Sequence, residues 1–205
     1  MDEFGYTPRM QRIVAGSLGG RHLLALPKTA AGVRPSSSRV RGAIFDRLQH
    51  EVPDARVLDL FAGSGALAIE ALSRGAAEAV LVEQQVSLTR FLDRQLGALD
   101  LLGRGAVVRA DARGFLDRGL QGRAAFDLVL VDPPYAELDL YTEVLARLDA
   151  HGWLAPSAVV VLEYIKRRGQ RPAIDIPPGL ESEAIRDHGQ TAIEFLRARD
   201  TNFHD

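Results

Sequence analysis

The sequence predicts an α/β protein: a mainly parallel sheet of seven strands, with helices on both faces and an antiparallel hairpin at one edge. From residue 56 onward, apolar strand-like segments alternate with segments of helical periodicity. The strand-like segments are continuous apolar runs, which indicates burial on both faces and therefore parallel strands. Near the C-terminus, ESEAIRDHGQTAIEFLRAR has the pattern of two strands joined at His188–Gly189, which predicts the edge hairpin.

Five strands and four helices are predicted for the parallel part of the sheet. In chain order the strands are VLDLFA, AVLVE, AVVRAD, DLVLVD and VVVLEY. The helices are predicted in ALAIEALSRG, in VSLTRFLDRQLGAL, in a short segment after Asp111 and in residues 139–149. In such a sheet, ligands bind beyond the carboxyl ends of the strands. The residues that follow each strand are therefore the first candidates for a functional site.

Residues 1–50 are predicted to form a basic N-terminal extension, and residues 51–205 the main domain. The extension holds eight Lys or Arg against three Asp or Glu, whereas the remainder holds seventeen against twenty-four. Residues 12–26 predict a small β-hairpin that turns at Gly19–Gly20. A helix is predicted next, in RPSSSRVRGAIFDRLQH, with Ser36 to Ser38 as candidate N-caps. Such charge marks either a solvated face or a surface for a polyanion, and charge alone does not decide between them.

Composition excludes several classes of function. The chain has 205 residues, is 46% apolar and 25% charged, and contains no cysteine, so disulfides, thiolate zinc sites and cysteine nucleophiles are excluded. The five histidines have no ligand spacing, and we expect no metal site. We also expect no membrane role, because no apolar run approaches the ~20 residues that span a bilayer. The start, MDEFGYTPRM, lacks the features of a secretory signal, which favours a cytoplasmic protein.

The first strand of the main domain runs into a glycine loop, DLFAGSGA, at residues 59–66. The loop also satisfies the relaxed dinucleotide pattern GxGxxA, so glycine spacing alone does not separate NAD from another nucleoside cofactor. Asp59, four positions before the first glycine, would face a pyrophosphate unfavourably but suits the cationic amino-acid end of S-adenosylmethionine. We therefore predict S-adenosylmethionine as the cofactor. Its predicted contacts in this loop are Asp59, Phe61, Ala62, Gly63, Ser64 and Gly65.

Three further acids follow the next strands. Glu83 lies twenty residues beyond Gly63, the spacing at which an acid accepts hydrogen bonds from ribose hydroxyls. Asp111, with Ala112 beside it, is predicted to contact the adenine, and Asp132 is predicted to lie near the cofactor as well. Any one of these acids is more often a solvated strand end. Four at the ends of successive strands indicate a functional edge of the sheet.

The stretch VLVDPPY, residues 129–135, carries the candidate catalytic residues. Its two prolines make the chain leave the sheet in a rigid, extended form. Asp132 and the Pro133 carbonyl can then accept the two N–H groups of an exocyclic amine and aim its lone pair at a methyl donor. Tyr135 can stack on the base that carries the amine. We predict Asp132, Pro133 and Tyr135 as catalytic residues.

DLFAGSGA together with DPPY resembles the S-adenosylmethionine-dependent amino-methyltransferases. RIVAGSLGGRHL, RPSSSRVRGAIFDRL and ALSRGAAEAVLVE resemble, more narrowly, the bacterial small-subunit ribosomal RNA guanine-N2 methyltransferases. The resemblance implies a Rossmann-like class I methyltransferase fold, S-adenosylmethionine as cofactor and methylation of one guanine N2 in 16S rRNA, free or within an assembling small subunit. The RNA contacts that it implies are Arg12, Arg21, Arg34, Arg39 and Arg41. The chain departs from the family pattern at Gly42, Gln84 and residues 164–178.

Other functions stay open from the residues alone. DPPY is shared with adenine-N6 enzymes that act on DNA or RNA. An NAD-dependent oxidoreductase would use the glycine loop but would leave DPPY unexplained. A non-catalytic RNA-binding module has no need of acids on the path of a polyanion. We further expect a monomer.

Overall fold

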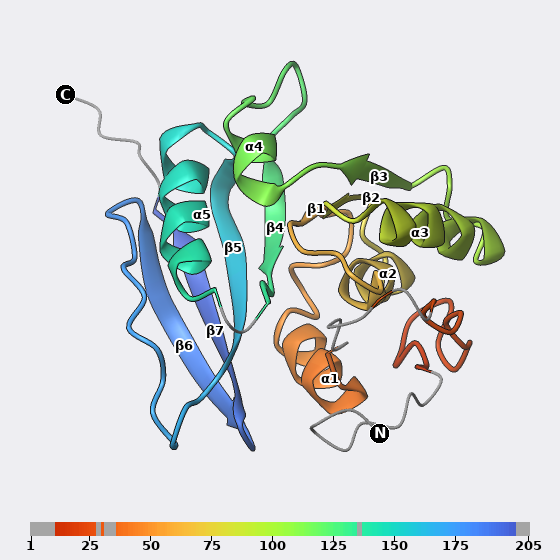
Figure 1. Cartoon of the computed structure of the whole chain (residues 1–205), viewed down its shortest axis with the longest axis horizontal. Coiled ribbons are helices and arrows are strands. Elements are labelled where there is room, and N and C mark those ends of the chain that lie inside the picture. Colours follow the sequence, from red (N-terminus) through yellow and green to blue (C-terminus); the bar gives the residue numbers. More distant parts are fainter. Residues whose placement is uncertain (1–10, 28–29, 31–35, 135–136, 200–205) are drawn as a thin grey trace.

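The computed structural model describes residues 11–27, 30, 36–134 and 137–199. One seven-stranded sheet crosses the molecule in the order β3-β2-β1-β4-β5-β7-β6 (Figure 1). The parallel strands β1 to β5 are followed by β6 and β7, which pair antiparallel to each other, with β7 antiparallel to β5. The predicted parallel sheet with an antiparallel edge hairpin is confirmed. The strands are β1 Arg56–Asp59, β2 Glu78–Glu83, β3 Gly105–Arg109, β4 Phe126–Val131, β5 Leu154–Ile165, β6 Leu180–His188 and β7 Thr191–Ala198.

Helices cover both faces of the sheet, as predicted (Figure 1). On one face lie α1 Ser38–Arg47, α2 Ala66–Ser73 and α3 Val86–Ala98, whose apolar side chains share one buried cluster with the strands. On the other face lie α4 Ala112–Leu116 and α5 Asp139–Ala150, with a second cluster. Because successive strand residues point to opposite faces, Val57 belongs to the first cluster and Leu58 to the second.

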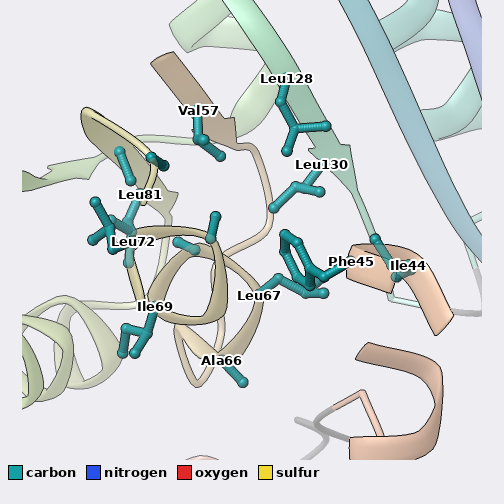
Figure 2. Close-up of a cluster of buried hydrophobic side chains, with 14 of the residues drawn as sticks. Ile44, Phe45, Val57, Ala66, Leu67, Ile69, Leu72, Leu81, Leu128 and Leu130 are labelled. Carbon is teal, nitrogen blue, oxygen red and sulfur yellow. The ribbon is translucent and has the colours of Figure 1, made fainter. Parts of the chain in front are cut away.

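The first cluster joins the helix of the N-terminal region to the sheet. Figure 2 shows Phe45 of α1 beside Leu67 of α2 and near Leu130 of β4. The Phe45 side chain is fully buried, and burial of a Phe side chain contributes roughly 1.5–3 kcal/mol. The position of α1 on the sheet is therefore fixed by the same apolar contacts that hold α2, the helix that begins at the glycine loop.

The small N-terminal β-hairpin is only partly present. Residues 12–26 form one isolated antiparallel bridge, Arg12 to His22, instead of the two short strands that we predicted. The chain does reverse there, and Gly20 has φ +82 and donates from its N–H to the Ile13 carbonyl at 2.8 Å. Regular pairing stops at this bridge because the N–H groups that follow bond elsewhere: those of Val14 and Ala15 to Glu70, and that of Leu24 to Gln95.

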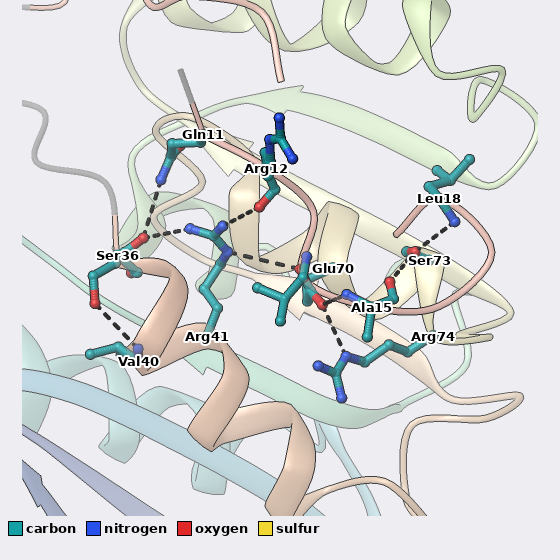
Figure 3. A network of polar contacts seen from close by, with 12 residues as sticks. Gln11, Arg12, Ala15, Leu18, Ser36, Val40, Arg41, Glu70, Ser73 and Arg74 are labelled. Carbon is teal, nitrogen blue, oxygen red and sulfur yellow. Dashed lines mark hydrogen bonds and ion pairs between the residues drawn. The ribbon is translucent and has the colours of Figure 1, made fainter. Parts of the chain in front are cut away.

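The N-terminal segment is fixed to α2 by buried polar contacts (Figure 3). The two oxygens of Glu70, whose side chain is fully buried, accept from Val14 N–H at 2.7 Å and Ala15 N–H at 2.9 Å. The Ser73 hydroxyl accepts from Leu18 N–H at 3.0 Å and donates to the Ala15 carbonyl at 2.6 Å. These bonds make the segment part of the layer that supports the glycine loop.

Ser37 is the N-cap of α1, and its side chain accepts from Val40 N–H at 3.2 Å. Ser36, one residue earlier, is buried and points elsewhere. Within the described part of the chain, no helix has the length and apolar character needed to cross a membrane.

Candidate active site

Four acids lie along one edge of the sheet. Asp59 ends β1, Glu83 ends β2, and Asp111 and Asp132 follow β3 and β4 within two residues. Because these four parallel strands are neighbours in the order β3-β2-β1-β4, the acids occur along the edge as Asp111, Glu83, Asp59 and Asp132. The structure thus brings together the acids that we predicted from strand ends.

The glycine loop connects β1 to α2 at this edge. Gly63 and Gly65 have φ +49 and φ +75, a backbone region that other residues rarely adopt. A Cβ atom on Gly65 would lie 2.7 Å from Leu92 Cδ2, so a larger residue would collide with α3. Ala62 and Ser64 are buried and Phe61 is half-buried. The loop is therefore a tightly packed turn that brings main chain close to the acidic edge.

Asp59 is almost fully buried. Burial raises its pKa to about 7; the N–H groups of Phe61 and Ala68 counteract this by donating to the carboxylate, and the charge of Glu83 raises the pKa further. A buried carboxylate with this pKa gains most from a cationic partner, because a nearby positive charge stabilises its ionised form.

Glu83 connects the end of β2 to the glycine loop. Its Oε2 accepts from Gly63 N–H at 3.0 Å, and its Oε1 accepts from Gln85 N–H at 2.8 Å. Each carboxylate oxygen can accept a second hydrogen bond, so the group retains capacity for hydroxyl donors. The N–H of Gly63, which would face the phosphates in a dinucleotide site, is directed at a carboxylate here.

Asp111 is exposed and is the N-cap of α4. Its Oδ2 accepts from Gly114 N–H at 2.8 Å, and its Oδ1 pairs with Arg113 Nε at 3.3 Å. Partial burial acts to raise its pKa, but the bonds from Gly114 and Arg113 outweigh this effect and hold the pKa below its ordinary value. Ala112 is buried in the second apolar cluster. The side chain that we predicted to contact the adenine is thus an ionised carboxylate that also caps α4.

Asp132 is half-buried and shares a hydroxyl group with a second acid. The Ser36 Oγ lies 3.1 Å from Asp132 Oδ2 and 2.6 Å from Oε2 of Glu163, an almost fully buried residue of β5. The pKa of Asp132 is well above its ordinary value because of burial first and then the charge of Glu163; the Ser36 bond lowers it, and the charge of Asp59 raises it. Pro133 is buried next to it.

Two anchors hold Ser36 and Glu163 in place. The Tyr141 hydroxyl of α5 donates to the Glu163 carbonyl at 2.6 Å. The Arg41 guanidinium of α1 donates to the Ser36 carbonyl at 2.6 Å and to the Arg12 carbonyl at 2.6 Å, and pairs with Glu70 at 3.9 Å (Figure 3). Helices from both faces of the sheet therefore fix the surroundings of Asp132.

The predicted RNA-contacting arginines have different surroundings. Arg12, Arg21 and Arg39 are exposed. Arg41 is 1% exposed, burial lowers its pKa against the opposing charges of Glu70 and Glu163, and its guanidinium is used in bonds within the protein. Arg34 and the predicted stacking residue Tyr135 lie outside the described residues. Of the five predicted RNA-contacting arginines, Arg12, Arg21 and Arg39 are therefore the described ones that a large ligand can reach.

The residues of the edge fit S-adenosylmethionine better than a dinucleotide. Glu83 at the end of β2 offers acceptors for hydroxyl groups, and Asp59 offers a negative charge next to the glycine loop. Two carboxylates beside the loop would repel a pyrophosphate. In the described residues we find no group of three or more His, Asp or Glu side chains arranged to hold a metal ion.

Ser36 and Glu163 are the two residues of the site that sequence reasoning missed. Glu163 had a signal: it is an acid inside the apolar run VVVLEY, and buried strand positions rarely carry a charge without a partner. Ser36 had none, because it is one of three consecutive serines that each qualify as an N-cap.

Comparisons with known proteins agree with this architecture. "Ribosomal RNA small subunit methyltransferase D" of Escherichia coli K12 is 40% identical over 152 residues, which cover 74% of this chain and 73% of that protein. The protein of the same name from Haemophilus influenzae is 32% identical over 164 residues, covering 80% of this chain and 81% of that one. The solved structure of yhhF from E. coli, described as a candidate methyltransferase, has a TM-score of 0.79 and 34% identity over 92% of this chain and 97% of its own.

The sheet order and these likenesses show a Rossmann-like methyltransferase fold. The family described as "Conserved hypothetical protein 95" matches residues 11–197, nearly the whole described chain. The resemblance to small-subunit ribosomal RNA methyltransferases is confirmed by the 40% identity to the E. coli protein. The chain therefore belongs to the Conserved hypothetical protein 95 family.

Proposed function

We propose that this protein transfers a methyl group from S-adenosylmethionine to the exocyclic N2 amine of one guanine in 16S ribosomal RNA. The observation that carries the proposal is the half-buried Asp132, which follows β4 on the same edge as Asp59, Glu83 and the glycine loop. The relatives named ribosomal RNA small subunit methyltransferase D support the coarser statement, methylation of small-subunit rRNA.

In this proposal the carboxyl ends of β1 and β2 hold the methyl donor. Glu83 accepts from the ribose hydroxyls, and Asp59 faces the cationic amino-acid end. The main chain of the glycine loop, fixed by the bond from Gly63 N–H to Glu83, forms the floor between them. Asp111 is assigned to the adenine amino group. S-adenosylmethionine supplies an electrophilic methyl group when it is bound.

Asp132 and Pro133 then orient the target amine. An amine attached to an aromatic base is a poor nucleophile, because its lone pair is delocalised into the ring. The Asp132 carboxylate and the Pro133 carbonyl accept the two N–H groups and aim the lone pair at the methyl carbon. The new nitrogen–carbon bond would form as the sulfur–carbon bond breaks and its electron pair stays on sulfur. The nitrogen would then release one proton to water. Tyr135 is assigned to stacking on the base.

The exposed arginines Arg12, Arg21 and Arg39 are assigned to the phosphates of the RNA. We place the protein in the cytoplasm, where ribosomal subunits assemble, and propose that it acts as a monomer on free 16S rRNA or on an assembling small subunit. The division into a basic extension, residues 1–50, and a catalytic domain, residues 51–205, is part of this proposal.

Binding and transfer experiments test the proposal against its alternatives. We expect S-adenosylhomocysteine to bind in equilibrium titrations and NADH not to bind, and labelled methyl groups to pass from S-adenosylmethionine to unmodified 16S rRNA or small subunits. NADH binding without S-adenosylhomocysteine binding would favour an oxidoreductase. Transfer to an adenine would assign the site to the adenine-N6 enzymes, and cofactor-free RNA binding would indicate a non-catalytic module.

A further inference from the structure

Ser36 is within hydrogen-bond distance of two carboxyl groups at once. Its Oγ lies 2.6 Å from Glu163 Oε2 and 3.1 Å from Asp132 Oδ2. A hydroxyl group has one proton, so it makes one full-strength donor bond. Both contacts are full hydrogen bonds when one of the two carboxyl groups carries a proton and donates it to Ser36 Oγ. The geometry therefore fits a pair of acids that share one proton through a hydroxyl.

The surroundings favour this single shared proton. Glu163 is 3% exposed, and Asp132 faces Glu163 from β5 and Asp59 from β1, so ionising both acids would place like charges side by side in a buried region. Arg41 of α1 is a positive group near Glu163, and its guanidinium also contacts Glu70 and two main-chain carbonyls. Burial and the like charges of Glu163 and Asp59 therefore favour a proton that is retained by the pair.

We propose that Ser36 and Glu163 form a proton relay that ionises Asp132 when the target amine arrives. In the free protein Asp132 donates its proton to Ser36 Oγ, and Ser36 donates to the Glu163 carboxylate through the shorter bond. When the amine N–H groups approach Asp132, its Oδ2–H bond breaks as a new bond to Ser36 Oγ forms. The original Ser36 O–H bond breaks as Glu163 Oε2 gains a proton. No proton is exchanged with solvent, and Asp132 becomes a carboxylate that accepts from the amine.

The relay makes Ser36 and Glu163 positioning residues that act through Asp132. It rests on the proposed function, because the amine is the ligand that triggers it. Its consequence is that methyl transfer is nearly independent of pH around neutrality, although the catalytic acid is protonated at rest. Without the relay, the Asp132 proton has to leave to solvent first, and the rate then rises with pH.

A matched pair of variants isolates the hydroxyl group. Ser36→Thr keeps the hydroxyl, and Ser36→Val replaces it by a methyl group of similar size, so both impose the same packing change. Single-turnover methyl transfer to 16S rRNA is measured with saturating S-adenosylmethionine, and each rate is divided by the wild-type rate at the same pH. Asp59 titrates in every variant, so its direct effect on the rate is common to both rates in the ratio.

We expect the ratio for Ser36→Thr to stay constant with pH. For Ser36→Val we expect the ratio at neutral pH to be lower by about tenfold or more. The ratio should then rise toward its full value over the next one to two pH units. Adding Glu163→Gln to Ser36→Val should shift this rise to lower pH, because one of the charges that raise the Asp132 pKa is gone. A merely structural role for Ser36 gives Val and Thr ratios that are both independent of pH, and this result overturns the relay.

A spectroscopic measurement tests the shared proton without RNA or methyl transfer. In infrared difference spectra at about pH 8.5, above the pKa of Asp59, wild type should show a protonated carboxyl band that Asp132→Asn removes and that Glu163→Gln causes to titrate at lower pH. A band that folded Asp132→Asn retains, or that titrates at the same pH in Glu163→Gln as in wild type, overturns the relay. If wild type transfers no methyl group while the band behaves as expected, the proposed function fails and the shared proton stands.

Discussion

Asp132 combines three properties that rarely occur together in one side chain: partial burial, a raised pKa and a rigid main chain that leads into two prolines. These properties follow from its place at the end of β4, between the acids of β1 and β5. Its predicted effect is on the chemical step, because a bond to the amine gains most as the nitrogen approaches the methyl carbon.

We expect Asp132→Ala to lower turnover by a factor on the order of a hundred or more while S-adenosylhomocysteine affinity persists. Asp132→Asn keeps an acceptor oxygen, so it should retain partial activity if acceptor geometry dominates over charge. Asp93→Asn, at an exposed position of α3, is the matched control. Wild-type turnover in folded Asp132→Ala under saturating cofactor would refute the assigned role.

Asp59 should make the stability of the cofactor-free protein depend on pH. Its pKa is about 7 in the folded state, whereas an unfolded aspartate has about 3.9. A raised folded pKa means that its contribution to the free energy of unfolding is fully present below about pH 4. The contribution is lost as pH rises through about 7, and linkage limits the loss to roughly 4 kcal/mol.

Urea unfolding of wild type and Asp59→Asn at a series of pH values measures this contribution. The difference in unfolding free energy between the two proteins should shift in favour of the variant as pH rises. A difference that does not change with pH would show that Asp59 titrates normally in the folded protein.

At the scale of elements, α2 is the element that unites the molecule. Its first residue, Ala66, is also the last residue of the glycine loop, and its apolar side chains lie in the first cluster. Its Glu70 and Ser73 side chains bind the N-terminal segment (Figure 3). Glu70 also pairs with Arg74 at 3.0 Å and with the buried Arg41 at 3.9 Å. Loss of this one carboxylate leaves two main-chain N–H groups without their acceptor and removes an ion-pair partner from the buried Arg41 guanidinium.

Glu70→Ala should therefore lower the free energy of unfolding by about 3–5 kcal/mol, as expected when one partner of a buried pair is removed. Glu78→Ala is the matched control. Glu78 also pairs with an arginine, Arg56, at 2.7 Å, but it is 46% exposed, and surface pairs contribute at most about 1 kcal/mol. Equal losses in urea unfolding would show that Glu70 acts as an ordinary surface acid.

Most elements could be predicted from the sequence because their signals are local. The apolar runs that became β1, β2 and β4 and the acids that follow them needed only strand periodicity and the rule for parallel sheets. The prediction of an N-terminal hairpin was only partly correct. The N–H groups of Val14 and Ala15 bond instead to Glu70, which is 56 and 55 residues away from them in the sequence. Ser36 and Glu163 are 127 residues apart, and only the folded sheet places them beside Asp132.

At the scale of the whole molecule, the N-terminal region carries exposed arginines, whereas the edge of the sheet carries acids that suit a small cofactor. Arg12, Arg21 and Arg39 are exposed, whereas Arg41 is enclosed. Replacing the three exposed arginines by Gln should weaken RNA binding. The slope of log affinity against log salt concentration should also become shallower by about 0.7–0.9 for each lost phosphate contact. Affinity for S-adenosylhomocysteine should not change.

A triple replacement of exposed arginines elsewhere controls for net charge. Arg118 and Arg123 lie in the loop before β4, and Arg186 lies on the edge strand β6. Affinities for 16S rRNA measured over a range of salt concentrations should remain closer to wild type in this control. Equal effects of the two triple variants would mean that RNA responds to total charge alone.

The central claim is methylation of a guanine N2 amine in small-subunit RNA, and nucleoside mass spectrometry tests it most directly. Unmodified 16S rRNA and small subunits are incubated with isotopically labelled S-adenosylmethionine and either wild type or Asp132→Ala, and the RNA is then digested to nucleosides. The account predicts labelled N2-methylguanosine at one site with wild type and a loss on the order of a hundredfold with Asp132→Ala. Label in a different nucleoside, or no label from either substrate in a protein that binds S-adenosylhomocysteine, would contradict it.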